Sequence, residues 1–370
     1  MDILGLLLGE RRVIGWLRTR IDTFLGQGEA AVTVPPMDGA LSPNTRLDRA
    51  RLAAAVPAPD DLAEGGGTVF FSSGDTVFRL DPESGATAPV RRFPAPVTCL
   101  AAFGETLAVG LAEGGLCILQ GGREIAVPSV ACATALAFAG PGTLLATQGS
   151  ARNGSGQWKP DLMQGGASGS VWEVSVADGT ARTLASGLAW PNGIAATPAG
   201  IVVSESWRHR LIRLDGPRTV PVLADLPGYP ARLAPARDGG WWLSVFAPRS
   251  QLVEFVLRER RYCDRMMAEI DPEHWLAPAI TPPKSFLEPM MGGALRTHGI
   301  VKPWAPTRSY GLLVRLDARF RPVRSFHSRA DGTRHGVTAA LDLGNRVLVA
   351  ARGGDAILDL DLDPAARDRK

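Results

Sequence analysis

The stretch LAWPNGIAATPAGIVVSESWRHRLIRLDG, residues 188–216, contains a Pro-Asn-Gly turn signal, two short aliphatic strands and a third strand that ends in Arg-Leu-Asp. Glycine and polar turn residues separate the three strands, as expected for a small antiparallel unit. Asn192 stands at the head of the first strand, which is otherwise aliphatic. On a solitary sheet edge this amide would only support a turn. If the unit repeats around a ring, the amide faces a common axis together with its counterparts.

The same unit recurs along the chain, at 60–81, 98–119, 134–150, 192–215, 231–255 and 335–361, with the third strand of the 134–150 copy displaced to 169–174. One turn glycine per copy marks the period: Gly67, Gly104, Gly142, Gly200, Gly240 and Gly344, at steps of 37, 38, 58, 40 and 104 residues. Three steps match the roughly 40-residue blade of a β-propeller, and the two longer steps contain insertions. The sequence therefore predicts an all-β protein, a six-bladed β-propeller whose closed ring leaves only short protected edges.

The first strand of each propeller blade lines the central channel, so its leading residue opens onto one mouth. Counting two residues back from the first aliphatic residue of each strand gives one position per blade: Asp60, Thr98, Thr134, Asn192, Ala231, and either His335 or Val337 in the sixth blade. Taken one at a time, Asn192 and Asp60 are typical turn residues. Six equivalent positions around one concave mouth instead predict a binding site.

Composition and charge exclude several classes of function. The chain of 370 residues carries 40 basic and 37 acidic residues, and its basic residues do not cluster, so we expect no nucleic-acid partner. Its four cysteines form no C-x-x-C pair, which argues against a zinc site, and four cysteines in so long a chain do not make a disulfide scaffold, although one bridge within the Cys99–Cys132 region stays open. Buried free thiols in a reducing compartment fit better, and the sequence predicts a cytoplasmic protein.

Three segments are expected along the chain: an N-terminal helix and linker over 1–56, the propeller over 57–363, and a polar tail over 364–370. Apolar residues recur at helical spacing in MDILGLLLGERRVIGWLRTRIDTFLG (1–26), with arginines between them. The first apolar run is too short to span a membrane, and no cleavage site follows it. Such a helix either makes peripheral contact with a membrane surface or packs against protein. The sequence leaves both alternatives open.

Two insertions interrupt the repeat, one over about 150–170 and one over about 256–310, ahead of the last blade. Long loops in compact domains often form lids or binding loops. The second insertion starts in a charged segment (254–280) that is expected to be helical until shortly before Pro278. Side chains from both insertions could roof the mouth and bind a substrate: Trp158, Met290, Met291, His298 and Trp304. Those of the second insertion could instead pack a helix against the side of the barrel.

Several motifs carry a family resemblance, in the expected order over about 57–363. LAWPNGIA (188–195) resembles a Phe-Pro-Asn-Gly-Val-Ala segment, and ADLPGYPARL (224–233) resembles Leu-Pro-Gly-Tyr-Pro-Asp-Asn. PAPDDLA (57–63), DGGWWLSV (238–245) and HGVTAALDLGNRVLVAA (335–351) resemble further blade segments. The chain is thereby similar to the strictosidine synthase-like family of six-bladed β-propellers, which is related to gluconolactonases, paraoxonases and diisopropyl fluorophosphatase. The resemblance implies a propeller that acts on a small molecule at the channel mouth.

The resemblance also implies a metal site, from which this sequence departs. Calcium-dependent relatives hold the ion with a glutamate, two amides and an aspartate from four blades, and the matching positions here are Asp60, Thr134, Asn192 and Ala231. Calcium prefers about six to eight oxygens and gains affinity from ligand charge. We therefore expect no cofactor, or weak Ca²⁺ binding through Asp60 and Asn192. Arg232 adds a positive charge beside the ring.

Strictosidine synthase chemistry itself is not expected. In that enzyme a catalytic glutamate follows two residues after an active-site histidine of the closing blade. Here His335 matches the histidine, but Val337 occupies the glutamate position and cannot move a proton. His335, alone or with Asp60, is therefore the candidate catalytic group of a metal-free reaction. The other ring positions are expected to contact substrate: Thr98, Thr134, Asn192 and Arg232.

Two functions fit these features. One is hydrolysis of a small ester or lactone at the channel mouth, which the polar ring and the two insertions favour. The other is a non-catalytic binding or scaffold propeller, held to a membrane by residues 1–26. The loss of the family carboxylates at Ala231 and Val337 favours this second function. We expect a small-molecule substrate or ligand.

Overall fold

The computed structural model describes residues 33–216, 218–284, 288, 296–297, 300–301 and 307–362. The chain divides into two units, 1–35 and 36–370, and only residues 33–35 of the first unit are described. Several predicted features lie outside the described residues: the helix over 1–26, the polar tail, and the candidate lid residues Met290, Met291, His298 and Trp304. Among the described helices, none has the length and apolar character that crossing a membrane requires.

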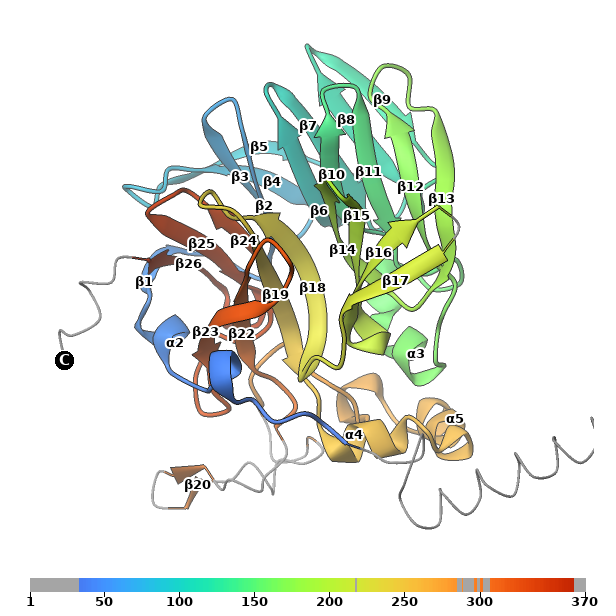
Figure 1. Cartoon of the computed structure of the whole chain (residues 1–370), viewed down its shortest axis with the longest axis vertical. Coiled ribbons are helices and arrows are strands. Elements are labelled where there is room, and N and C mark those ends of the chain that lie inside the picture. The colour runs from blue at the N-terminus through green and yellow to red at the C-terminus, as the bar shows by residue number, and fades with distance from the viewer. Residues whose placement is uncertain are drawn as a thin grey trace, which may run out of the picture. The chain divides into compact units, whose positions relative to one another are not determined.

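The second unit is the predicted six-bladed β-propeller, built from six four-stranded antiparallel sheets (Figure 1). The first blade consists of β2 (Pro59–Gly65), β3 (Thr68–Ser73), β4 (Thr76–Leu80) and β5 (Thr87–Arg92). The second consists of β6 (Val97–Phe103), β7 (Thr106–Leu111), β8 (Leu116–Gln120) and β9 (Arg123–Val127). The third consists of β10 (Ala133–Gly140), β11 (Thr143–Gln148), β12 (Gly169–Ser175) and β13 (Ala181–Leu188).

The remaining three blades follow the same order from the channel outward. The fourth consists of β14 (Pro191–Thr197), β15 (Gly200–Glu205), β16 (Arg210–Asp215) and β17 (Arg218–Leu223). The fifth consists of β18 (Gly228–Pro235), β19 (Trp241–Pro248), β22 (Gly311–Leu316) and β23 (Pro322–Ser328). The sixth consists of β24 (Val337–Asp342), β25 (Arg346–Ala351), β26 (Ala356–Asp361) and β1 (Arg51–Ala55).

The inner strands close into a ring. Each of β2, β6, β10, β14, β18 and β24 contacts the next, and β24 contacts β2. The N-terminal strand β1 pairs with β26, so the start of the propeller completes its last blade. Residues 51–55, expected to belong to a linker, therefore form the outer strand that joins the two ends of the ring.

The segment ahead of β1 also packs on the propeller. It contains the 3₁₀ turn η2 (Gly39–Leu41) and the short helix α2 (Arg46–Arg49), both of which contact β23. Leu47 of α2 is fully buried in the core between the fifth and sixth blades. Asn44 Nδ2 donates to the carbonyl oxygen of Ser325 at 3.0 Å, and Asp48 Oδ1 accepts from Ser328 Oγ at 2.7 Å.

The first insertion follows β11 and the second lies inside the fifth blade, between β19 and β22. The first contains η3 (Ser155–Gln157) and α3 (Trp158–Met163). The second contains α4 (Gln251–Val256), α5 (Arg260–Glu269), η5 (Pro272–His274), β20 (Arg296–Thr297) and β21 (Ile300–Val301). The one helix predicted to run to just before Pro278 is thus two shorter helices, and Pro272 lies beyond the end of α5 because proline cannot continue a helix. In Figure 1, α3, α4 and α5 lie together at one end of the blades, and α3 contacts α5.

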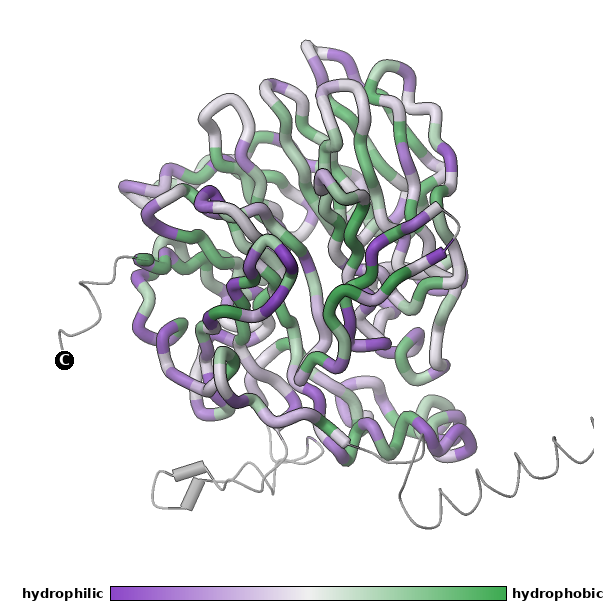
Figure 2. Tube along the Cα trace, in the orientation of Figure 1, coloured by the Kyte–Doolittle hydropathy of each residue, from purple (hydrophilic) through white to green (hydrophobic). Residues whose placement is uncertain are grey.

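The hydrophobic core lies between neighbouring blades. One cluster joins Ala108 and Ile118 of the second blade to Leu144 and Ala146 of the third. In Figure 2 the strands are mostly green or pale, and purple residues gather at the turns. Five of the six predicted turn glycines adopt positive φ, Gly142 being the exception, which only glycine does at little cost. All four cysteines are free and buried.

Candidate functional site

Each inner strand contains a β-bulge near the end at which it begins. In four blades the pairing of the inner strand with the second strand skips one inner-strand residue, within 97–99, 133–135, 191–193 and 337–339. In the first and fifth blades two inner-strand residues lie opposite a single residue of the second strand, within 59–62 and 230–233. A bulge adds one residue that does not pair across the ladder, and it redirects a side chain. The bulges therefore turn one side chain per blade toward the channel.

These side chains line a cavity of about 310 Å³, called the mouth cavity below: Asp60, Thr98, Thr134, Asn192, Arg232 and Thr338, one from each blade. The positions in the first four blades are those that the sequence predicted. In the last two blades the count is wrong, because Ala231 and Val337 are buried in the core and the next residue of each strand lines the cavity. In the fifth blade, Ala231 and Arg232 together oppose Ser244, and a count from the first aliphatic residue does not reveal which of them turns inward.

Asn192 lines the mouth cavity without a hydrogen-bond partner for its amide among the described residues. It therefore does not cap a turn. Gly193 follows it because a Cβ at this position would lie 2.3 Å from the carbonyl oxygen of Ala231 in the next blade. Thr338 Oγ1, also in the cavity lining, is buried without a partner in the described part of the chain. Since buried polar groups are normally paired, the Thr338 hydroxyl points to a ligand, and the partly buried amide of Asn192 faces the same cavity.

The carboxylate of Asp60 contacts two guanidinium groups. Arg232 Nη1 donates to Asp60 Oδ1 at 3.1 Å, and Arg352 Nη1 donates to Oδ2 at 2.8 Å. Arg352 begins the 3₁₀ turn η6 (Arg352–Gly354), directly after β25. Its side chain is 41% exposed and Asp60 is its one side-chain partner within the described residues. The remaining N–H donors of Arg352 are therefore available to a ligand in the mouth cavity.

Aromatic side chains form one wall of the mouth cavity. Trp158 from α3, Trp190 just before β14 and Phe246 from β19 all line it. Trp158 meets Phe246 edge-on with ring centroids 5.6 Å apart, and Trp190 stacks on Trp207 at 5.2 Å. The indole of Trp207 is fixed in place because its Nε1 donates to the buried Asp161 Oδ1 at 2.8 Å. The first insertion thus contributes Trp158 to the site, as the sequence predicted.

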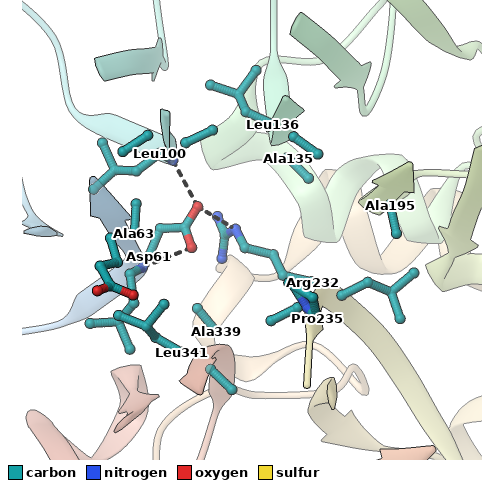
Figure 3. A pocket seen from close by; sticks show the side chains of 18 of the residues that line it. Asp61, Ala63, Leu100, Ala135, Leu136, Ala195, Arg232, Pro235, Ala339 and Leu341 are labelled. Atoms are coloured by element: carbon teal, nitrogen blue, oxygen red, sulfur yellow. Dashed lines mark hydrogen bonds and ion pairs between the residues drawn. The ribbon is translucent and has the colours of Figure 1, made fainter. Parts of the chain in front are cut away.

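Arg232 separates the mouth cavity from a second cavity of about 410 Å³ at the other end of the channel, and it lines both. The walls of the second cavity are mostly aliphatic. Figure 3 shows Asp61 and Arg232 facing each other inside it, with Leu100, Leu136 and Leu341 around them. The nearest approach is 3.0 Å, between Arg232 Nε and Asp61 Oδ2.

Asp61 is almost completely buried, and its charge is partly supported by the backbone. Its Oδ1 accepts from the N–H of Leu62 at 2.8 Å, and its Oδ2 accepts from the N–H of Leu100 at 2.7 Å. Burial raises the pKa of the Asp61 carboxyl to about 6, although Arg232 and the two N–H groups act in the opposite direction. At neutral pH Asp61 and Arg232 therefore form a buried ion pair that closes the channel.

His335 does not belong to the lining of the mouth cavity. Its imidazole is fully buried, with Nδ1 2.8 Å from Ser309 Oγ and Nε2 2.8 Å from the carbonyl oxygen of Arg329. Burial lowers the pKa of His335, and both ring nitrogens are engaged by the protein. The geometry therefore does not support the catalytic role that the sequence suggested for this histidine.

The residues present do not fit a resident metal ion. The oxygens that converge on the channel axis already contact the guanidinium of Arg232, which supplies the positive charge there. Asp60 and Asn192, the expected weak Ca²⁺ ligands, have no further acidic partner in the cavity lining. Within the described ranges, no group of three or more His, Cys, Asp or Glu side chains is placed to hold a metal.

The lining residues that were not predicted as site residues include Trp190, Phe246, Thr338 and Arg352. Trp190 directly precedes the Pro-Asn-Gly motif, so its place beside that motif is the sequence feature that points to it as a site residue. Phe246 and Arg352 come from the end of the second strand of their blades, or just after it. A count based on first strands cannot find these two residues.

Comparisons with known proteins agree with this architecture. No protein-family model matches the chain, and no curated protein matches it significantly. Among solved structures, a gluconolactonase from Xanthomonas campestris is 13% identical and covers 86% of this chain and 91% of its own, with a TM-score of 0.53. A putative gluconolactonase is 11% identical and covers 84% and 91%, with a TM-score of 0.52. The calcium-binding protein regucalcin from Agrobacterium tumefaciens is 13% identical and covers 81% and 84%, with a TM-score of 0.50. At these identities the similarity shows a shared fold, and the strictosidine synthase-like assignment stays a prediction.

Proposed function

We propose that the protein is a hydrolase of small lactones or esters, and that its substrate binds in the mouth cavity. One observation carries the proposal: the unpaired amide of Asn192 and the unpaired hydroxyl of Thr338 share a cavity with the Asp60 carboxylate and an aromatic wall. The solved gluconolactonases of the same fold support the reaction class.

The size and walls of the cavity suit a small cyclic ligand that carries several oxygens. Ligand cavities are commonly about 300–1,000 Å³, apolar over most of their surface, with a few placed polar groups. The mouth cavity, at about 310 Å³, lies at the small end of that range. Trp158, Trp190 and Phe246 offer flat apolar faces, and Thr98, Asn192 and Thr338 offer hydrogen bonds.

The proposed reaction uses groups of this chain. Asp60 Oδ2 accepts a proton from water as the water oxygen attacks the carbonyl carbon of the substrate. The amide N–H of Asn192 and the spare N–H donors of Arg352 stabilise the negative charge that develops on the carbonyl oxygen. The carbon–oxygen bond to the leaving alkoxide then breaks, and the proton passes from Asp60 to that oxygen. A lactone yields a hydroxy acid, and an ester yields an acid and an alcohol.

Hydrolysis of a panel of five- and six-membered sugar lactones and short-chain esters tests the proposal, with acid release followed in a pH-stat. We expect turnover of at least one class, and a fall in kcat/KM of about 10²–10⁴-fold in Asp60→Asn, because the general base is lost. Asp215→Asn makes the same change at an exposed position outside the mouth cavity and should stay within about twofold of wild type.

Two results would count against the hydrolase. One is that no member of the panel is hydrolysed above the buffer rate. The other is that Asp60→Asn is as active as Asp215→Asn. Because Asp60 also pairs with Arg232, thermal unfolding of both variants separates loss of chemistry from loss of fold.

Non-catalytic ligand binding is the second candidate function. It is favoured by the fact that both oxygens of Asp60 contact guanidinium groups, which leaves less of the carboxylate free to accept a proton. Binding of lactones or of their hydroxy acids, measured by titration calorimetry without any turnover, would support this function instead.

A further inference from the structure

The guanidinium of Arg232 lies inside a cage of oxygen atoms from three other blades. Its Nη1 donates to the backbone carbonyl of Asp60 at 3.0 Å and to that of Thr338 at 3.3 Å, and its Nη2 donates to the carbonyl of Thr98. The carboxylates add Asp60 Oδ1 at 3.1 Å from Nη1 and Asp61 Oδ2 at 3.0 Å from Nε. Five oxygens from β2, β6 and β24 therefore surround one cation that reaches in from β18.

This donor set resembles the environment of a hard metal ion more than that of an ordinary ion pair. Ca²⁺ is bound by carboxylate and backbone carbonyl oxygens, with water completing its coordination. The chain supplies three carbonyls and two carboxylates at one point on the channel axis. Without a cation there, the carboxylates of Asp60 and Asp61 would repel each other in a buried position, and a buried charge that loses its partner strongly destabilises the fold.

We propose that Arg232 is a tethered cation that links its own blade to three others where a divalent metal ion would otherwise bind, and that removal of its side chain uncovers a latent site for a hard divalent cation such as Ca²⁺. The wild-type propeller is then independent of metal for its stability. The inference concerns the structure of the channel and does not depend on the proposed hydrolase activity.

Thermal unfolding of Arg232→Ala in CaCl₂ and in EDTA tests the proposal. In EDTA the variant should unfold at a lower temperature than wild type. Free Ca²⁺ at about 100 times its dissociation constant should raise the Tm of the variant by roughly 3–8 °C. The Tm of the wild-type protein should be the same in both solutions. Titration calorimetry of the variant should detect one bound ion per chain.

Two control variants isolate the role of the charge and of the oxygen cage. Arg232→Lys keeps a positive charge in the channel, so it should fold and remain insensitive to Ca²⁺. Arg249→Ala removes another mostly buried arginine, which pairs with Asp225 and Glu254 and lines neither of the two channel cavities. Arg249→Ala should be destabilised and should not be rescued by Ca²⁺.

Refolding with and without Ca²⁺ covers the case in which Arg232→Ala does not fold in EDTA. Recovery only in the presence of the cation supports the proposal. Three results overturn it: a wild-type Tm that rises with Ca²⁺ as much as that of Arg232→Ala, an Arg232→Ala variant whose folding is unaffected by Ca²⁺ while Arg232→Lys folds normally, and an Arg249→Ala variant that Ca²⁺ rescues equally well.

Discussion

At the scale of single residues, four charges dominate the channel. Asp60 and Asp61 supply two negative charges, and Arg232 and Arg352 supply two positive charges. A buried charge is tolerated when it is paired and hydrogen-bonded. These charges differ in burial: Arg352 is partly exposed at the mouth, whereas the Asp61–Arg232 pair is buried. Removal of either inner charge should therefore disturb the fold more than removal of Arg352.

Because Asp61 is buried, we expect the stability of the folded protein to depend on pH. The pKa of Asp61 rises from an ordinary 3.8 to about 6 in the folded protein, chiefly because of burial. The folded protein therefore binds this proton more tightly than the unfolded chain does. The resulting stabilisation is fully present below about pH 4 and is lost as the pH rises through about 6.

Asp61→Asn removes this titration. We expect the unfolding free energy of wild type, minus that of Asp61→Asn, to fall by up to about 3 kcal/mol between pH 4 and pH 7. Urea denaturation of both proteins across this range measures the difference. A difference that stays constant, or that grows with pH, would show that burial does not set the protonation of Asp61.

At the scale of secondary-structure elements, the β-bulges decide which side chains face the channel. Sequence periodicity places the strands but does not show where a strand gains a residue. The predicted ring was therefore right for Thr98, Thr134 and Asn192, where one residue leaves the ladder. It was off by one in the fifth blade, where two residues lie opposite Ser244 and the second of them, Arg232, enters the channel.

Closure of the ring by β1 predicts that residues 36–56 are part of the fold. A protein that begins at residue 57 lacks β1 and the buried Leu47 of α2, and it leaves one edge of β26 unpaired. We expect its Tm to fall by about 10 °C or more relative to a protein that begins at residue 36. Differential scanning calorimetry of the two truncated proteins measures the effect. Equal transitions would mean that β1 contributes little to ring closure.

At the scale of the whole propeller, the sequence predicts the number of blades because each blade repeats the same local pattern of strands and turn glycines. It does not predict how the ring closes, because Arg51–Ala55 pairs with β26, some 300 residues later in the chain. The aromatic wall was predicted only in part: Trp158 lies in an insertion, where a binding residue was expected, whereas Phe246 lies near the end of the second strand of its blade. The internal ion pair was missed because Asp61 and Arg232 come from blades that are not adjacent.

The assembled propeller has two unlike cavities on one axis, and Arg232 separates them. The mouth cavity has a polar ring, an aromatic wall and unpaired hydrogen-bonding groups, whereas the opposite cavity is mostly aliphatic. These differences support the mouth cavity as the place of the proposed chemistry. That end is also where the first insertion, through Trp158, adds to the ring.

The most direct test of the mouth cavity as the site of hydrolysis is the kcat/KM of Asn192→Ala compared with that of Asn345→Ala, on the best substrate of the lactone and ester panel. Asn345 lies in the turn between β24 and β25 and does not line the mouth cavity, so its variant is the matched control. Loss of the Asn192 amide should lower kcat/KM by about 10²–10³-fold with an unchanged Tm, and the control should match wild type. An Asn192→Ala protein as active as Asn345→Ala would contradict the assignment of the site.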